Sequence, residues 1–257
     1  MAAKPPVALQ MYTVRDDASR DFPGTLARIA RIGYAAVELG GYPGRDPAEV
    51  RRLLDENGLA AAGAHSGIDV LENALPEAIA YVHALGTSFL TCPYLPEERR
   101  RTIDDYRAVG RVLRAAGERA ADEGVTLSYH HHAFEFETRG EDGQYGLDAL
   151  LDAAGPSVGL ELDTFWVAKG GEDPAAYLRR YAGRVHLVHL KDMTAGVERT
   201  FAEVGEGTLD WPAIFAAAEA PGGAVRYYIV EQDHCYGRTP LESAAVSFDH
   251  LRAWGRA

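Results

Sequence analysis

Three consecutive histidines, His130, His131 and His132, follow the strand-like residues 125–129 (VTLSY) and precede alternating aromatic and acidic residues. Residues 125–129 are typical of a buried β-strand. Side chains alternate along a strand, so His130 and His132 share one face and His131 points to the other. Two imidazoles on one face at the end of a buried strand indicate a ligand site. His131 is expected to be structural.

Acids and histidines also stand at the ends of other strand-like segments. Buried strands usually exclude charge, so a repeated pattern of this kind indicates a shared site. Lys191, one of three lysines in the chain, follows His189 by two residues and therefore shares its face. Gln10 and Tyr12 end the first such segment. The acids and histidines at the other ends are Glu38, His65, Asp163, His189 and Glu231.

The elements that must position these residues alternate between strands and helices along the whole chain. Period-two and apolar runs predict strands at residues 7–12, 34–39, 59–65, 88–92, 125–131, 158–163, 184–190 and 225–231. Helical spacing predicts helices between and after them. This alternation favours an α/β fold, a single-domain (β/α)₈ barrel spanning residues 1–257. A doubly wound sheet usually has a glycine-rich turn after its first strand, and residues 14–17 contain no glycine.

In such a barrel the active site lies at the carboxyl ends of the strands, where these side chains would meet. His130, Asp163, His189 and Glu231 would come from the fifth to eighth strands. Two imidazoles and two carboxylates suit one divalent metal ion, Mn²⁺ first, with Zn²⁺, Co²⁺, Fe²⁺ or Mg²⁺ as alternatives. The alternative is a set of hydrogen-bonded barrel residues. Unpaired carboxylates would repel one another, which favours the metal.

Several of the remaining polar and aromatic candidates have more than one interpretation. Glu38 and His65 would bind substrate hydroxyls or close a polar network at the barrel mouth. His132 would orient a neighbour, transfer a proton or belong to a loop. Lys191 would hold a substrate oxygen, stabilise an enolate or pair with an acid at the rim. Gln10 and Tyr12 are candidates for substrate contact, and Trp166 would wall the apolar face of a sugar or serve packing.

Composition limits the partners of the chain. The 257 residues are 47% hydrophobic and 25% charged, with a net charge of −12. The acidic balance argues against nucleic acid and anionic membranes as partners. Cys92 and Cys235 form no metal or redox motif, and no signal peptide or membrane-spanning run is evident. We therefore expect a cytoplasmic protein. Homo-oligomerisation stays open.

Several motifs give the chain a family resemblance. It resembles the xylose isomerase-like TIM-barrel superfamily, in the sugar phosphate isomerase/epimerase branch that also holds inosose dehydratase and ketose 3-epimerases. This resemblance implies a metal held at the ends of strands five to eight, which falls on His130, Asp163, His189 and Glu231. The motifs that carry it are residues 9–16 (LQMYTVRD), 32–38 (IGYAAVE), 129–136 (YHHHAFEF), 161–166 (ELDTFW), 187–193 (LVHLKDM), 204–207 (VGEG), 210–211 (DW) and 229–233 (IVEQD).

Two departures from the family pattern limit the transfer of function. In the epimerases the ligand on strand five is a glutamate that pairs with the glutamate on strand eight. Here that position is His130. The DNA-repair endonucleases of the superfamily need histidines where this chain has Trp166 and residues 199–201 (RTF), so that activity is not expected.

The leading expectation is a metal-dependent sugar, keto-sugar or cyclitol isomerase or epimerase that works through an enolate. Glu231 would take the α-proton, and His132 or Lys191 would return one. A lyase or dehydratase that uses the same site is the first alternative, and a non-catalytic sugar-binding barrel is the second. A phosphate-ester hydrolase would need a cationic phosphate site, for which Lys191 and residues 205–207 are a poor basis.

Overall fold

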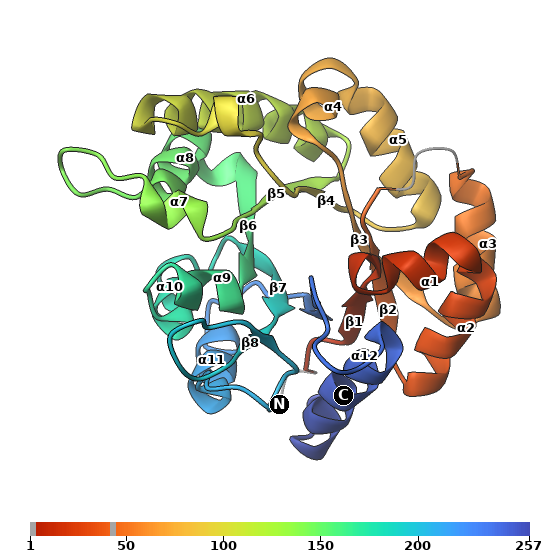
Figure 1. Cartoon of the computed structure of the whole chain (residues 1–257). Coiled ribbons are helices and arrows are strands. Elements are labelled where there is room, and N and C mark those ends of the chain that lie inside the picture. Colours follow the sequence, from red (N-terminus) through yellow and green to blue (C-terminus); the bar gives the residue numbers. More distant parts are fainter. Residues whose placement is uncertain (1–3, 42–44) are drawn as a thin grey trace.

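A computed structural model describes residues 4–41 and 45–257. Within these residues eight parallel strands close into a barrel ringed by helices (Figure 1). The order around the barrel is β1-β10-β7-β6-β5-β4-β3-β2. The predicted (β/α)₈ barrel is therefore confirmed. The strands are β1 (Val7–Gln10), β2 (Ala36–Leu39), β3 (Ala60–His65), β4 (Phe89–Cys92), β5 (Thr126–His130), β6 (Val158–Asp163), β7 (Val185–Leu190) and β10 (Tyr227–Val230).

Helices follow the strands as the sequence predicts, and several begin at a capping side chain. Asp21 accepts a hydrogen bond from Gly24 N, and Thr102 and Asp105 form a capping box. Such caps satisfy the free N–H groups of the first turn. The principal helices are α2 (Phe22–Ile32), α3 (Pro47–Glu56), α5 (Leu75–Leu85), α6 (Ile103–Asp122), α8 (Gly146–Ala154), α10 (Pro174–Arg180), α11 (Trp211–Ala218) and α12 (Pro240–Ala253).

Short elements fill the connections at the carboxyl end of the barrel, and the sequence did not predict them. The first predicted strand extends to Tyr12, but β1 ends at Gln10, whose side chain accepts a hydrogen bond from Tyr12 N and starts a 3-10 turn. The short helices are α1 (Arg15–Arg20), α4 (Ile68–Asn73), α7 (Phe134–Glu137) and α9 (Thr164–Lys169), and the 3-10 turns at this end are η1 (Met11–Val14) and η2 (Glu97–Arg99). A third 3-10 turn, η3 (Gly155–Ser157), lies at the opposite end, directly before β6.

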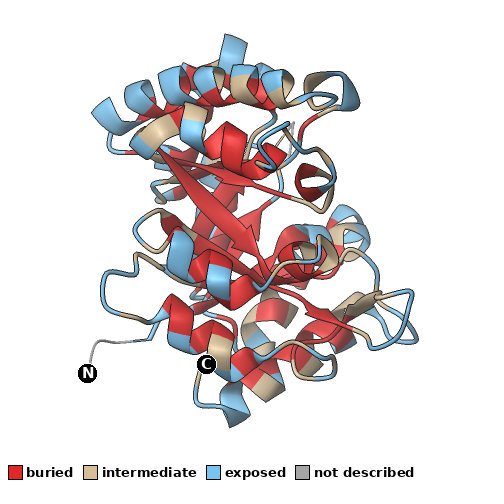
Figure 2. Ribbon diagram, turned by 90° about the vertical axis from the view of Figure 1, so that its left-hand side faces the viewer, coloured by how far each residue is buried: buried red, intermediate tan, exposed pale blue. Residues whose placement is uncertain are grey.

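The strands are buried on both faces (Figure 2), and the barrel interior has two layers of different chemistry. The lower layer is a small apolar cluster, and the upper layer, nearer the carboxyl ends, is polar. Along β7, for example, Leu187 belongs to the lower layer and His189, two residues on, to the upper. The lower layer comprises Ala8, Ala36, Ala62, Phe89, Leu187, Tyr227 and Ile229. The upper layer comprises Gln10, Glu38, His65, Thr91, His130, Glu161 and His189.

The long connection after β7 is anchored by one buried carboxylate. Here β8 (Asp192–Met193) pairs antiparallel with β9 (Phe201–Ala202). The Asp192 carboxylate accepts hydrogen bonds from four backbone N–H groups and from Trp211 Nε1. Gly207 lies so close that a Cβ would clash with Asp192 Oδ1 at 2.2 Å. The start of this connection, directly after Lys191, is therefore fixed.

Two other sequence expectations concern cysteines and membranes. Cys92 and Cys235 are both free thiols. In residues 4–41 and 45–257, no helix has both the length and the apolar character needed to cross a membrane.

Candidate active site

A pocket of about 410 Å³ opens at the carboxyl end of the barrel. Five residues that the sequence analysis singles out line it, coming from the ends of β1, β3, β5 and β10 or the segments that follow. The sequence therefore predicted the place of the pocket. Its lining comprises Tyr12, Gly40, His65, Pro93, Tyr94, His130, His132, Glu231 and Asp233.

The four predicted metal ligands meet beneath this pocket. One donor atom from each of His130, Asp163, His189 and Glu231 lies within 4.8 Å of the others, and all four residues are buried. Asp163 Oδ2 makes no hydrogen bond but forms an ion pair with Lys191 Nζ at 3.1 Å, while Oδ1 accepts a hydrogen bond from Trp166 N at 3.0 Å. This donor set fits a single divalent ion.

The His189 ring separates two groups of carboxylates. Its Nδ1 lies 2.9 Å from Glu231 Oε2 and 4.0 Å from Asp163 Oδ2. Its Nε2 lies 2.7 Å from Glu38 Oε2. Burial by itself would lower the pKa of this imidazole, but the surrounding carboxylates, Glu161 first, raise it well above its ordinary value. His189 therefore connects the ligand set with the acids deeper in the barrel.

Lys191 places a buried ammonium among three carboxylates. Its Nζ lies 2.7 Å from Glu231 Oε2, 3.1 Å from Asp163 Oδ2 and 2.9 Å from Asp233 Oδ2. Burial opposes the charge, yet the three carboxylates raise the pKa of Lys191 well above its ordinary value. The residue is 1% exposed, so its ammonium lies beneath the pocket lining.

The predicted substrate contacts divide between the pocket and the interior. Tyr12 stands at the rim, 46% exposed, and His65 lines the pocket. Gln10 and Glu38 are fully buried below it, where Gln10 Nε2 donates to Glu38 Oε2 at 2.7 Å. The Trp166 ring lies behind the lining, against His132 and Phe201. Contact of Gln10, Glu38 and Trp166 with substrate therefore stays a prediction.

The three histidines of residues 130–132 have different surroundings. His132 packs among Tyr94, Phe134 and Trp166, and burial first, then the charge of His130, lowers its pKa well below the ordinary value. It is therefore neutral at neutral pH.

His131 points away from the pocket, as alternation predicts. Its Nε2 accepts a hydrogen bond from Asp163 N at 3.1 Å, and its Nδ1 lies 3.3 Å from His132 O. Burial lowers the pKa of His131 to about 3. A neutral imidazole thus links the end of β5 to the backbone of a ligand on β6.

Glu135, which the sequence analysis did not select, holds the segment after β5. Its two oxygens accept hydrogen bonds from Tyr129 Oη at 2.5 Å and from His132 N at 2.8 Å. The side chain is fully buried, and burial raises its pKa to about 8. Its place in the motif at residues 129–136 was visible, but its inward direction depends on the turn into α7.

Glu161 is the second residue that the sequence analysis missed. Its Oε2 lies 3.0 Å from His65 Nε2, 3.1 Å from His130 Nδ1 and 3.3 Å from His189 Nε2. Burial by itself would raise its pKa, but His189 and His65 hold the pKa of Glu161 well below its ordinary value. The signal that could have found it is strand alternation, because Glu161 precedes Asp163 by two residues.

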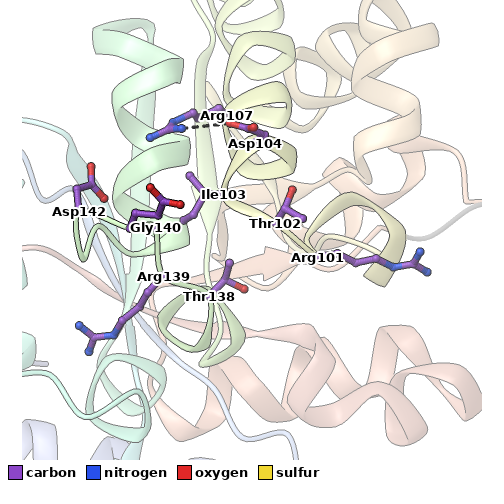
Figure 3. Close-up of a pocket in the computed structure, with 10 residues that line it drawn as sticks. Arg101, Thr102, Ile103, Asp104, Arg107, Thr138, Arg139, Gly140 and Asp142 are labelled. Carbon is purple, nitrogen blue, oxygen red and sulfur yellow. Dashed lines mark hydrogen bonds and ion pairs between the residues drawn. The ribbon is translucent and has the colours of Figure 1, made fainter.

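A larger hollow of about 680 Å³ lies outside the barrel, between the start of α6 and the loop at residues 138–142 (Figure 3). None of the predicted site residues lines it. Its three arginines are balanced by three acids, and Arg107 already pairs with Asp104 at 3.1 Å. This hollow lacks a convergent set of reactive groups, so the candidate site is the barrel mouth.

Comparison with known proteins agrees with this fold. The model of the xylose isomerase-like TIM barrel family matches residues 26–254, and the chain belongs to that family. The rhizopine catabolism protein MocC of Rhizobium meliloti is 30% identical over 88% of this chain and 79% of its own. An inosose dehydratase of Geobacillus kaustophilus is 28% identical, over 74% of this chain and 73% of its own.

A solved structure described as a sugar phosphate isomerase/epimerase, from Parabacteroides distasonis, is also similar. It superposes with a TM-score of 0.84 at 26% identity, over 98% of this chain and 95% of that one. L-ribulose 3-epimerase, at 17% identity and a TM-score of 0.72, shares the fold. The relatives thus include sugar isomerases, epimerases and inosose dehydratases.

Proposed function

We propose that this protein is a divalent-metal-dependent enzyme that moves a proton at the carbon next to the carbonyl of a keto-sugar or keto-cyclitol. The observation that carries the proposal is the buried donor set of His130, Asp163, His189 and Glu231 directly below a pocket. When bound there, a divalent ion supplies a Lewis acid for a substrate carbonyl.

Glu231 is the proposed base, because it is both part of the donor set and part of the pocket lining. Burial would by itself raise its pKa, but Lys191 and His189 hold the pKa of Glu231 well below its ordinary value. It is therefore ionised at neutral pH, as a group that takes a proton must be. Lys191, 2.7 Å away, balances the charge in the same place.

Isomerisation or epimerisation is the first candidate outcome, since return of the proton elsewhere gives those products. Dehydration is the second, and two observations favour it. His130 occupies the place of the second epimerase glutamate, and inosose dehydratases are among the sequence relatives. Asp233, which lines the pocket 2.9 Å from Lys191, is a candidate to assist a leaving hydroxyl.

The substrate is proposed to carry no phosphate. Among the described lining residues there is no arginine or lysine, whereas Glu231 and Asp233 are acidic. Lys191 is already surrounded by three carboxylates. The nearby Arg15 donates to the carbonyl oxygens of Tyr12 and Asp233. A phosphate dianion would therefore meet net negative charge, which costs binding energy.

The test is solvent exchange in D₂O, with Mn²⁺-loaded protein and panels of ketohexoses and keto-inositols followed by proton NMR. We expect deuterium at the carbon beside the carbonyl, with an epimer or aldose as product in one outcome and loss of water in the other. Glu231→Gln should slow exchange by about 10²-fold or more. Phosphorylated counterparts should react more slowly than the free ketoses.

The alternative class, a sugar-binding barrel without catalysis, makes the opposite prediction. It binds polyols without incorporating deuterium into any of them. Exchange at an unchanged rate in Glu231→Gln would reject Glu231 as the base while leaving the reaction class in place.

A further inference from the structure

We propose that Glu38 and Glu161 are positioning residues that fix the ring orientation and tautomer of the two ligating histidines, His189 and His130. The inference deepens the proposed function and rests on it, because it takes these histidines as ligands of a divalent ion. Glu38 comes from β2 and Glu161 from β6, and both are fully buried beneath the pocket.

Three imidazole nitrogens, each from a different strand, lie close to one carboxylate oxygen of Glu161. His65 Nε2, His130 Nδ1 and His189 Nε2 lie 3.0, 3.1 and 3.3 Å from its Oε2. Its other oxygen accepts a hydrogen bond from Thr91 Oγ1 at 3.2 Å. His130 Nδ1 has no aligned hydrogen-bond partner among the described residues, and Glu161 Oε2, 3.1 Å away, is the carboxylate oxygen that it faces.

Glu38 has the same relation to His189. Its Oε2 lies 2.7 Å from His189 Nε2 and 3.2 Å from His65 Nε2, and it accepts a hydrogen bond from Gln10 Nε2 at 2.7 Å. The Gln10 side chain is held in turn, because its Oε1 accepts a hydrogen bond from Tyr12 N. The carboxylate is thereby fixed in place before any ligand arrives.

A carboxylate that faces one ring nitrogen determines what the other nitrogen can do. A neutral imidazole carries one N–H, which it donates to the carboxylate, so the second nitrogen presents its lone pair. For His189 the lone pair is then on Nδ1, the atom that faces Asp163 and Glu231. For His130 it is on Nε2. Carboxylates placed behind ligating histidines commonly act in this way.

A second metal ion inside the barrel would be the rival interpretation, because Glu38, His65, Glu161 and His189 also bring their donor atoms together. Each of these nitrogens already faces a carboxylate oxygen at 2.7 to 3.3 Å. Hydrogen bonds between these nitrogens and oxygens therefore account for the cluster without a metal ion. A second ion would also require His189 to use both ring nitrogens as ligands, which leaves it no N–H to donate.

The test combines zinc titration calorimetry with nitrogen NMR of the histidine rings, using full-length protein labelled with ¹⁵N-histidine. In the wild-type zinc complex we expect one ion per chain, the His189 proton on Nε2 and the His130 proton on Nδ1. Two ions per chain, or either proton on the opposite nitrogen, would overturn the proposal. This measurement needs no variant and so does not depend on the folding of one.

Glu161→Gln and Glu38→Gln then test the cause. Each keeps the shape of the side chain, removes its charge and adds an N–H₂ donor. Zinc affinity should fall about 10- to 100-fold in both. Glu135→Gln is the matched control, a buried glutamate that contacts neither ligand ring, and its affinity should stay within about threefold. The NMR spectra should show a changed tautomer for His130 in Glu161→Gln.

Two failures are distinguishable. Wild-type protein that binds no divalent ion would contradict the proposed function itself. Wild-type binding, combined with unchanged affinity and tautomers in Glu161→Gln and Glu38→Gln, would reject the positioning role and leave the metal centre in place.

Discussion

The lower and upper layers of the barrel interior use the same strands for opposite purposes. On β1, β2 and β7, the residue two positions further along the strand is polar where the first is apolar. These pairs are Ala8 and Gln10, Ala36 and Glu38, and Leu187 and His189. The lower layer is held by apolar packing, and the hydrophobic effect that stabilises it does not depend on the direction of each side chain. The upper layer is held by paired charges, in which each partner is needed. Buried charge is tolerated here because Glu38 and Glu161 each face histidines that come from other strands.

The largest predicted effect follows from removing the residue shared by both sets of carboxylates. His189→Ala should abolish high-affinity zinc binding and destabilise the fold by about 3 to 5 kcal/mol, since buried acids lose their partner. Leu187→Ala, one step lower, should cost a similar 2 to 5 kcal/mol through the cavity it leaves. Calorimetry should nevertheless find its zinc affinity unchanged.

This pair of variants separates stability from ligand binding. If Leu187→Ala weakens zinc binding as much as His189→Ala does, the two layers are not independent. The comparison would then fail.

The second prediction concerns Lys191, the buried cation that directly follows β7. Lys191→Met should destabilise the metal-free protein by about 3 to 5 kcal/mol, because Asp163, Glu231 and Asp233 lose their common partner. Added Mn²⁺ should restore part of the loss, so the rise in melting temperature on metal addition should exceed that of the wild type. A smaller rise than in the wild type would mean that Lys191 does not substitute for a metal charge.

The third prediction is a pH dependence at Glu135. Burial raises its pKa from 4.5 to about 8, so between these values the folded protein holds a proton that the unfolded chain releases. The protonated Glu135 therefore contributes to the free energy of unfolding. This contribution is fully present below pH 4.5 and is lost as the pH rises through 8, at up to about 1.4 kcal/mol per pH unit. Glu135→Gln lacks the titration, so its stability relative to wild type should improve from pH 5 to pH 8. Urea unfolding at several pH values measures this, and a constant difference would contradict it.

The smallest effect is expected at the edge of the upper layer. Thr91→Val removes the hydrogen bond to Glu161 Oε1 while keeping the shape of the side chain. A hydrogen bond to a charged group contributes about 1.5 to 3 kcal/mol. Because Oε2 keeps its three imidazoles, zinc affinity should fall by only a few fold. A loss as large as that of Glu161→Gln would mean that Thr91 matters more to the site than the carboxylate charge.

Much of the architecture was predictable because strand and helix periods are local properties. All eight strands and the meeting of His130, Asp163, His189 and Glu231 follow from alternation plus the rule that barrel sites lie at carboxyl strand ends. The family resemblance adds the same four positions. The substrate and catalytic roles stay predictions, because a pocket lined by His65, His132 and Glu231 can accommodate more than one polyol.

Other features depend on long-range contacts that no local pattern contains. Glu161 lies two residues before the end of β6, so a pattern of strand-end acids and histidines does not include it. Strand alternation nevertheless places it on the same face as Asp163. Gln10 and Glu38 look like rim residues in the sequence, but both are fully buried under the lining, where Gln10 Nε2 donates to Glu38 and Glu38 faces His189 Nε2. The β8–β9 pair forms through Asp192, whose five donors are up to 19 residues away.

Asp192 has a consequence for how this connection can diverge. The Asp192 carboxylate accepts hydrogen bonds from four backbone N–H groups in residues 193–209 and from the Trp211 indole, so it fixes several parts of the connection at once. The hairpin tip lies beyond it, and Val197 there is 99% exposed. Substitutions and insertions at the tip therefore leave Lys191 where it is. The surface at the rim of the barrel can therefore change while the candidate site stays the same, provided that Asp192 and Gly207 are kept.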